Sequence, residues 1–416
     1  MPYTGSFRVY TTAQRDALSG ISTSTMIYNS TTDKTQIYDG TSWLDVGTVS
    51  PPAWQTAAGE LADIYHHSRD DSNTLPATLS ATHATITVTY SVTAGSIPGG
   101  LTLNSNGTWS GTPNSVGSDA TSTFTVRATA SGATSDREFT IKIRSERTTN
   151  YNYSGSNHTW TRPGAGCTKL YFEMWGGAGG SGSCTELDGP RGDGGKSWGT
   201  ITGITGDLTL QVAQGGRNHS NSSSGGWPNG GEGNDEHSCK GGGGGGSSNI
   251  FDEGGQTTFS DLIAVAGGGG GVVHSNPDSY GGDGGGTNAQ SSNRGGGGGS
   301  QNGGGSAGSN GGCGNGSNAG GQLAGGNAGT GSGCVNSGAG GGGGYYGGGD
   351  GGNSNSGNSY AGGGGGSGYI NSSRVSGGNT VQSSGGGWGT NKPSGVATGG
   401  TGDNIHGEPG HITIKH

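Results

Sequence analysis

Residues 261–271 read DLIAVAGGGGG, an apolar run of strand length that passes directly into five consecutive glycines. The same transition occurs at residues 169–177 (KLYFEMWGG) and 207–216 (DLTLQVAQGG). Runs rich in β-branched and aromatic residues, bounded by glycine, indicate β-strands. We therefore expect strands at 169–175, 207–212 and 261–266, each leading into a glycine-rich segment. A further strand is expected at 411–414, close to the end of the chain.

Between these strands, glycine recurs with a period of three in short series: Gly176, Gly179 and Gly182; Gly305, Gly308, Gly311 and Gly314; Gly338, Gly341, Gly344 and Gly347. Three residues per turn is the period of the polyproline-II helix. A glycine on one face lets a neighbouring backbone approach, so that the free N–H and C=O groups can pair between segments. The pattern predicts ordered polyglycine-II helices with glycine facing inward. The alternative is a disordered glycine linker, because glycine loses the most entropy on folding.

The composition separates this region from the rest of the chain. Of 416 residues, 102 are glycine, and 90 of these follow residue 150. Hydrophobic residues make up 26% and charged residues 11%, against about 45–50% and about 25% in ordinary globular chains. With only 12 prolines and no strict triplet, collagen is excluded. A single large apolar core is excluded as well.

Charge and hydropathy narrow the classes of partner. The net charge is −9 and no basic run occurs, which argues against nucleic acid. The first residues lack the features of a secretory signal, and no stretch approaches the ~20 apolar residues of a membrane span. We expect a protein made in the cytoplasm and not embedded in a membrane. Five cysteines without a C-x-x-C pair argue against a disulfide scaffold.

Two all-β regions precede the glycine-rich one. In residues 1–48, runs at 25–29 and 35–39 form an expected hairpin, followed by a short strand at 43–46. So few apolar residues do not stabilise a monomer, and we expect this segment to associate with its own copies or with another subunit. In residues 51–146, alternation in the runs 86–92, 124–128 and 139–143 predicts a β-sandwich of immunoglobulin-like size.

The middle region resembles a known module. The residues that carry the resemblance are 90–92, 95–104 (GSIPGGLTLN), 107–113 (GTWSGTP), 124–128 and 137–141. They resemble the cadherin-like, immunoglobulin-like module of bacterial and phage surface proteins. The resemblance implies a spacer or presentation domain.

The glycine-rich region resembles the distal domain of phage tail fibres and adhesins. The residues that carry this resemblance are 159–166 (TWTRPGAG), 169–177, 267–271 and 407–414 (GEPGHITI). The resemblance implies a small β-sandwich joined to a stack of polyglycine-II helices whose loops contact the host. Residues 12–18 and 28–32 are also similar to short repeats of tail-fibre proteins.

Sequence motifs that would indicate catalysis, ligand recognition or metal binding are weak in this chain. Gly195-Lys196-Ser197 lacks the first glycine of a P-loop, since position 190 is proline, and Gly304 to Gly308 has no helix after it. The tripeptide Arg191-Gly192-Asp193 is expected to be incidental. The ligand cluster around His237 and Cys239 lacks the four ligands of a structural zinc site. We predict no catalytic residues, no metal and no cofactor.

Aromatic residues among Asn, Ser and Gly interrupt the glycine runs, a composition typical of binding loops. The candidate receptor-binding residues are Trp227, Asn229, Asp278, Tyr280, Tyr345, Tyr346 and Tyr360. The alternative for each aromatic is that it only covers a glycine helix.

The sequence predicts an all-β, modular tail fibre or adhesin that attaches a virion to a host receptor, either a glycan or an outer-membrane protein. Residues 151–416 would form the receptor-binding tip. Residues 1–48 would oligomerise, as a homotrimer, or dock to other tail proteins. The first alternative is a purely structural fibre or decoration protein. A polysaccharide depolymerase is a weaker alternative, because the paired acidic residues of a glycosidase are not visible.

Overall fold

A computed structural model of the chain describes residues 8–47, 50–65, 75–83, 86–182, 190–218, 223–236, 239–273, 280–293, 295–309, 316–330, 334–355, 361–383, 392–399 and 405–416. The regular secondary structure of these residues consists of β-strands, with one short α-helix and one 3₁₀ turn among them. The predicted all-β class is therefore confirmed. The chain divides into two compact units, Met1–Ile64 with Ser72–Arg144, and Tyr65–Asp71 with Ser145–His416.

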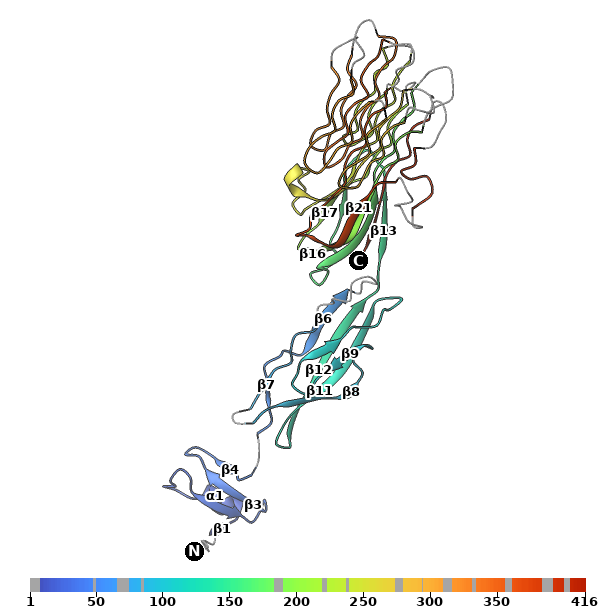
Figure 1. Ribbon diagram of the computed structural model, residues 1–416. Helices are drawn as coiled ribbons and strands as arrows, with labels where there is room; N and C mark the ends of the chain where they lie inside the picture. The colour runs from blue at the N-terminus through green and yellow to red at the C-terminus, as the bar shows by residue number, and fades with distance from the viewer. Residues whose placement is uncertain are drawn as a thin grey trace. The chain divides into compact units, whose positions relative to one another are not determined.

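The N-terminal strands form one four-stranded sheet in the order β1-β2-β3-β4 (Figure 1). The predicted hairpin is present as β2 (Met26–Asn29) and β3 (Lys34–Tyr38), followed by β4 (Trp43–Asp45). Sequence reasoning missed β1 (Arg8–Tyr10), which pairs in parallel with β2, and the helix α1 (Thr12–Asp16). Thr11 and Gln14 close a capping box at the start of α1, a local signal that was present in the sequence.

The two faces of this sheet differ in what covers them. On one face, α1 reaches the buried polar residues: Arg15 Nη1 donates to Gln36 Oε1 at 2.8 Å, and Asn29 Nδ2 donates to Gln36 Oε1 at 3.0 Å. The strand registers place an apolar set on the other face: Val9, Met26, Tyr28, Ile37, Leu44 and Val46. Val9 is 61% exposed, Leu44 50%, Val46 45% and Met26 38%. We call this set the open face.

Residues 59–144 form a four-stranded sheet in the order β6-β12-β11-β8, with the pairs β9–β10 and β5–β7 beside it. The bounds are β5 Ala53–Trp54, β6 Gly59–Tyr65, β7 Ala81–Thr82, β8 Thr89–Gly95, β9 Leu101–Leu103, β10 Trp109–Gly111, β11 Ala120–Ala130 and β12 Ala133–Arg144. Phe124, Val126 and Ala128 in β11 are buried, as are Phe139, Ile141 and Ile143 in β12, so the predicted alternation is confirmed there. The run expected at 86–92 becomes a strand only from Thr89.

The second unit contains two five-stranded antiparallel sheets, β13-β22-β15-β16-β21 and β14-β17-β18-β19-β20. The bounds are β13 Thr148–Asn152, β14 His158–Trp160, β15 Lys169–Trp175, β16 Lys196–Thr202, β17 Leu208–Gln211, β18 Ser248–Phe251, β19 Leu262–Ala266, β20 Tyr369–Ile370, β21 Val375–Val381 and β22 His411–Lys415. All four predicted strands of this region are confirmed, as β15, β17, β19 and β22. The missed strands are either very short, as in β20 (YI) and β18 (SNIF), or rich in polar residues and glycine, as in β21 (VSGGNTV).

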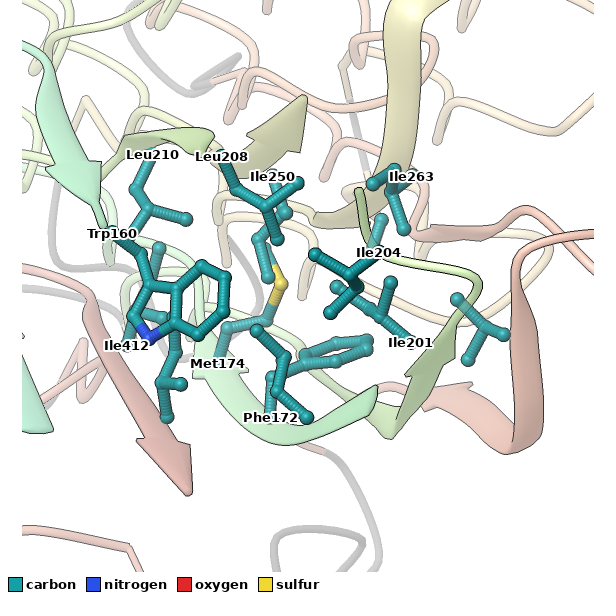
Figure 2. Close-up of a cluster of buried hydrophobic side chains, with 14 of the residues drawn as sticks. Trp160, Phe172, Met174, Ile201, Ile204, Leu208, Leu210, Ile250, Ile263 and Ile412 are labelled. Atoms are coloured by element: carbon teal, nitrogen blue, oxygen red, sulfur yellow. The ribbon is translucent and has the colours of Figure 1, made fainter. Parts of the chain in front are cut away.

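Buried side chains from both sheets form the core between them. Figure 2 shows Phe172, Met174, Ile201 and Ile412 of the first sheet together with Trp160, Leu208, Leu210, Ile250 and Ile263 of the second. Phe172 and Met174 are fully buried. This small sandwich is stabilised in the ordinary way, by removal of apolar surface from water.

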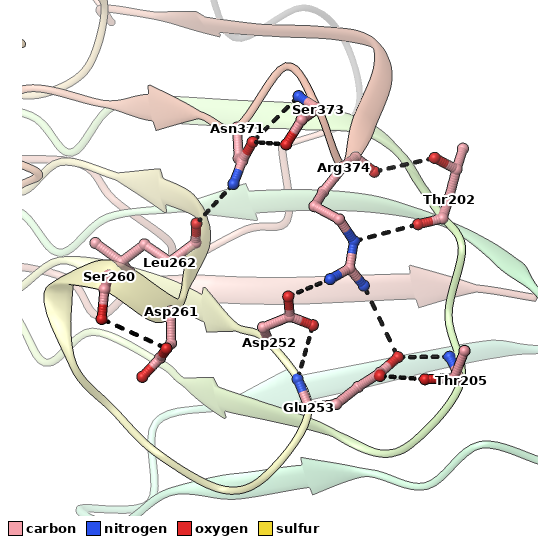
Figure 3. Close-up of polar contacts among 10 residues, drawn as sticks. All are labelled: Thr202, Thr205, Asp252, Glu253, Ser260, Asp261, Leu262, Asn371, Ser373 and Arg374. Atoms are coloured by element: carbon pink, nitrogen blue, oxygen red, sulfur yellow. Dashed lines mark hydrogen bonds and ion pairs between the residues drawn. The ribbon is translucent and has the colours of Figure 1, made fainter.

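The turn between β20 and β21 ties the two sheets together at their end away from the glycine-rich segments (Figure 3). Arg374 donates from Nη1 to Asp252 and lies 3.8 Å from Glu253 Oε1, both of which follow β18. Its backbone O accepts a hydrogen bond from Thr202 N at 2.8 Å, on the other sheet. The charged side chain therefore fixes a turn that apolar packing does not cover.

The structure describes three of the five cysteines. Cys167 is a buried free thiol, and burial raises its pKa to about 11. Cys239 and Cys334 are disulfide-bonded, a pairing that was not predicted from the sequence, where the cysteine pattern argued only against a disulfide scaffold. An odd cysteine count excludes complete pairing but does not exclude a bond between a few of them.

Candidate functional site

The glycine-rich segments extend side by side from the ends of the two sheets (Figure 1). At their centre lies the segment 267–273, which continues β19. Its backbone hydrogen-bonds to six other segments, 176–182, 190–195, 240–246, 280–285, 338–344 and 361–366. With each of five of these segments it makes two bonds spaced three residues apart, such as Gly268 N to Gly343 O and Gly271 N to Gly340 O. We call this arrangement, together with the further segments that bond to its outer members, such as 347–351, the glycine stack.

The spacing within the glycine stack excludes side chains at its centre. A Cβ atom added at Gly267, Gly268, Gly269, Gly270 or Gly271 would lie between 1.9 and 2.3 Å from a carbonyl oxygen of a neighbouring segment. Cβ atoms do not approach backbone oxygens so closely in real proteins, and the neighbouring backbones are themselves hydrogen-bonded in place. Each of the five glycines is therefore required by packing.

Outer segments tolerate some side chains. In residues 176–182, Gly176, Gly177, Gly179 and Gly180 meet a backbone atom within 2.3 Å, whereas Ala178 and Ser181 carry side chains. The expectation of one inward-facing glycine per turn therefore understates the requirement, because a segment with neighbours on several sides needs two or three glycines per turn. The polyglycine-II conformation itself stays a prediction.

Three aspartates stand alone between glycines inside the glycine stack: Asp193, Asp283 and Asp350. Asp350 is fully buried, and burial raises the pKa of its carboxyl group to about 7. Burial, reinforced by the nearby Asp283 carboxylate, raises the pKa of Asp193 to about 6. Two of these three residues lie beside each other, since the backbone N–H of Asp193 donates to Asp283 Oδ1 at 2.9 Å.

Asp193 and Asp283 line a cavity of about 560 Å³ on the side of the glycine stack. The other lining residues are Pro190, Arg191, Tyr280, Gly281, Gln290 and Thr398. Arg191 is buried and donates to the backbone oxygens of Gly399 and Ile405. Its guanidinium holds the chain together and is not presented at the surface, which agrees with the tripeptide 191–193 being incidental as a recognition motif.

Two of the sequence-predicted residues, Tyr345 and Tyr346, lie in an aromatic cluster where the glycine stack meets β19 and β20. The Tyr345 ring stacks between Phe259 at 4.4 Å and Tyr369 at 4.0 Å, measured between ring centroids. Tyr346 packs edge-on against Tyr345 at 5.4 Å. Tyr345 thus packs within the protein, which favours the alternative considered for each aromatic, and its role in receptor binding stays a prediction.

The other candidates lie elsewhere. Trp227 packs against Tyr153 with ring centroids 6.2 Å apart, and Asn229 is exposed beside it with a φ of 70°. Tyr280 lines the cavity beside Asp283. Asp278 and Tyr360 lie outside the described residues. The described candidates thus occupy three separate places on the unit.

Sequence reasoning missed the cavity residues other than Tyr280. The available signal was a charged residue between glycines: Asp193 and Asp283 line the cavity, whereas Asp350, in the same setting, is fully buried. Nothing in the sequence indicated that Gln290 and Thr398 lie beside them, because these contacts join segments far apart in the chain.

Among the described residues, no three His, Cys, Asp or Glu side chains are grouped to hold a metal ion. The helices in the described part of the chain are all too short or too polar to span a bilayer.

Comparison with known families identifies one part of the chain. Residues 61–144 match a family model described as "Putative Ig domain". This agrees with the expected immunoglobulin-like module and with the sheet β6-β12-β11-β8 that these residues form. A search of curated proteins found no match to the chain.

Proposed function

We propose that this protein is a phage tail fibre or adhesin that attaches the virion to a host cell-surface receptor through the glycine-rich unit. The observation that carries the proposal is the glycine stack. It is a frame of packed backbones with almost no side chains of its own. Any recognition must therefore use the loops and the cavity at its margins, which can vary without disturbing the frame. Such an arrangement suits a surface that has to follow a changing receptor.

The immunoglobulin-like module supports a modular, extended architecture. Its match covers residues 61–144, and its core is formed by side chains of its own, such as Phe124 and Phe139. We propose that it acts as a spacer between the N-terminal sheet and the glycine-rich unit.

The N-terminal sheet supports assembly through residues 1–48. Its open face exposes four large apolar side chains on one side of one sheet, and such a patch marks a protein interaction surface when it is contiguous. We propose that the open face packs against other copies of this chain, as a homotrimer, or against another tail protein. Changing Leu44 and Val46 together to Ser should then lower the oligomeric mass measured by light scattering.

A purely structural fibre or decoration protein is the second candidate. The same open face and spacer would serve it equally well, so only the glycine-rich unit separates the two proposals. If the unit binds no receptor, its loops have no partner and changes in them are neutral for infection.

Competition for adsorption tests the proposal directly. Purified full-length protein is added to host cells before the virions, and free virions are counted. We expect adsorption to fall in proportion to the protein added, and protein with residues 151–416 deleted should have no effect. Undiminished adsorption at saturating protein would favour the structural role.

A further inference from the structure

The cavity beside Tyr280 has the size and the wall of a small-molecule site. Its volume of about 560 Å³ falls within the range of ligand pockets, about 300–1,000 Å³. It is formed where three segments are held together by backbone bonds: Gly281 N to Pro190 O at 3.1 Å, Gly284 N to Asp193 O at 2.8 Å, and Gly194 N to Ala397 O at 2.8 Å. The wall is therefore preorganised by the glycine stack.

Some polar groups of the wall are already used within the protein. Asp193 accepts a hydrogen bond from Gly399 N at 2.5 Å, and Arg191 is committed to backbone oxygens. The oxygen Oε1 of Gln290 accepts from Asp283 N at 3.1 Å. These bonds fix the positions of the side chains and orient their remaining polar atoms.

Three groups remain for a ligand. Within the described residues, no hydrogen bond is made by the oxygen Oδ2 of Asp283, the amide N–H₂ of Gln290 or the hydroxyl of Tyr280. They are an anionic acceptor, a neutral donor and an aromatic ring that carries a hydroxyl. A ligand that satisfies all three needs hydroxyl groups that both donate and accept, and an apolar face for the ring.

We propose that this cavity binds one neutral sugar residue of a host cell-surface glycan. The ring of Tyr280 covers the apolar face of the sugar, the carboxylate of Asp283 accepts from its hydroxyls, and the amide of Gln290 donates to a ring or hydroxyl oxygen. Acidic sugars are disfavoured, because Asp193 and Asp283 line the same cavity. The inference rests on the proposed attachment function and names its receptor chemistry.

A cationic side chain of a protein receptor is the main competitor for two neighbouring carboxylates. The wall argues against it, because the polar group that Gln290 leaves for a ligand is a donor, its Oε1 already accepting from Asp283 N. A cation would also leave the amide of Gln290 unpaired, which is costly for a group taken out of water.

Titration of the purified full chain with sugars tests the inference. The probes are the methyl glycosides of glucose, galactose, mannose and N-acetylglucosamine, with methyl glucuronide as the acidic comparator, observed by saturation-transfer NMR. We expect at least one neutral glycoside to bind and the glucuronide to bind more weakly. Asp283→Asn and Tyr280→Ala should each weaken binding about tenfold or more. Asp235→Asn, which removes an exposed carboxylate from the same unit, is the matched control and should bind as the wild type does.

Gln290→Glu separates the two ligand chemistries. It keeps the oxygen that accepts from Asp283 N but replaces the donor by a third carboxylate. A sugar should bind more weakly to this variant, whereas the methyl ester of arginine would bind more tightly if the site takes a cation. That tightening, or the failure of every neutral glycoside to bind wild-type protein, would overturn the inference. So would binding that is unchanged in both Asp283→Asn and Tyr280→Ala.

The adsorption experiment distinguishes this failure from failure of the proposed function. Protein that blocks adsorption but binds no sugar keeps the attachment role and refutes the sugar site. Protein that binds a glycoside through Asp283 but does not block adsorption keeps the sugar site and refutes attachment. Thermal melts of each variant show whether a loss of binding comes from loss of the fold.

Discussion

Around Phe172, every strand of the C-terminal unit contributes side chains to a core between two sheets. Around Gly269, in the same unit, the nearest atoms belong to the backbones of neighbouring segments, and each backbone is held by hydrogen bonds to its neighbours. The first region follows from hydrophobic burial. The second replaces side-chain packing by backbone packing, and its stability depends on the complete pairing of N–H and C=O groups that would otherwise be buried without partners. The two regions meet at β15 and β19, which pass from one kind of structure into the other.

The sandwich should respond most strongly to loss of side-chain volume. Phe172→Ala removes a fully buried ring and should cost about 3–5 kcal/mol of unfolding free energy. Thermal unfolding followed by calorimetry measures the loss. Phe259→Ala, which truncates a half-exposed phenylalanine of the same unit, should cost clearly less. Equal costs would mean that the core is not where the sandwich derives its stability.

The glycine stack should respond to gain of volume, even of one methyl group. Gly269→Ala places a Cβ about 2.0 Å from Gly192 O and should cost roughly 1–3 kcal/mol, the usual range for overpacking. Gly303→Ala is the matched control, because nothing lies within 4 Å of its added Cβ. Chemical denaturation compares the two variants. If Gly269→Ala is as stable as Gly303→Ala, the packed stack is refuted.

A buried carboxyl group gives the glycine stack a pH dependence of its own. The pKa of Asp350 is raised by burial to about 7, above its value in the unfolded chain. The folded state then holds the proton more tightly, so stability is greatest below about pH 4 for this group and falls as the pH rises toward 7. Asp350→Asn should flatten this part of the stability curve and raise the melting temperature at pH 8. Asp235→Asn, at an exposed site, should leave the curve unchanged.

The aromatic cluster lies at the junction between the sandwich and the glycine stack. Tyr345 stacks on both Phe259 and Tyr369, and each such pair contributes about 0.5–1.5 kcal/mol. Tyr345→Ala should therefore lower stability by about 1–3 kcal/mol and leave adsorption of virions to host cells unaffected wherever the variant is folded. Loss of adsorption by folded Tyr345→Ala virions would return this residue to the receptor-binding set.

How far the sequence predicted this molecule depended on which atoms do the packing. Strands held by apolar side chains were predictable, because the apolar composition of runs such as Leu170 to Trp175 and Leu262 to Ala266 indicates that they are buried. Strands such as β21, with two glycines and several polar residues, carry no such signal and are specified by their neighbours in the sheet. In the glycine stack, the sequence indicates close packing but not which segments pair, because glycine has no side chain that would distinguish one partner segment from another.

The candidate site shows the same division. Tyr280 was found from its place in a polar interruption of the glycine runs. Gln290 and Thr398 could not be found, because their proximity depends on the register of three segments, two of which are 206 residues apart where Gly399 bonds to Asp193. Tyr345 was selected for its residue type, and only its neighbours reveal that it packs within the protein.

Hydrogen exchange of the backbone amides is the most direct test of the glycine stack. The amides of Gly268 to Gly271 each donate to a carbonyl of a neighbouring segment, as regularly as those of β19 before them. We predict that peptides covering 267–271 exchange as slowly as peptides covering Leu262–Ala266, with the exposed loop around Gly254 and Gly255 as the fast reference. Exchange of 267–271 at the rate of that loop, while β19 stays protected, would contradict the account and leave the glycine runs as unstructured linkers on a small sandwich.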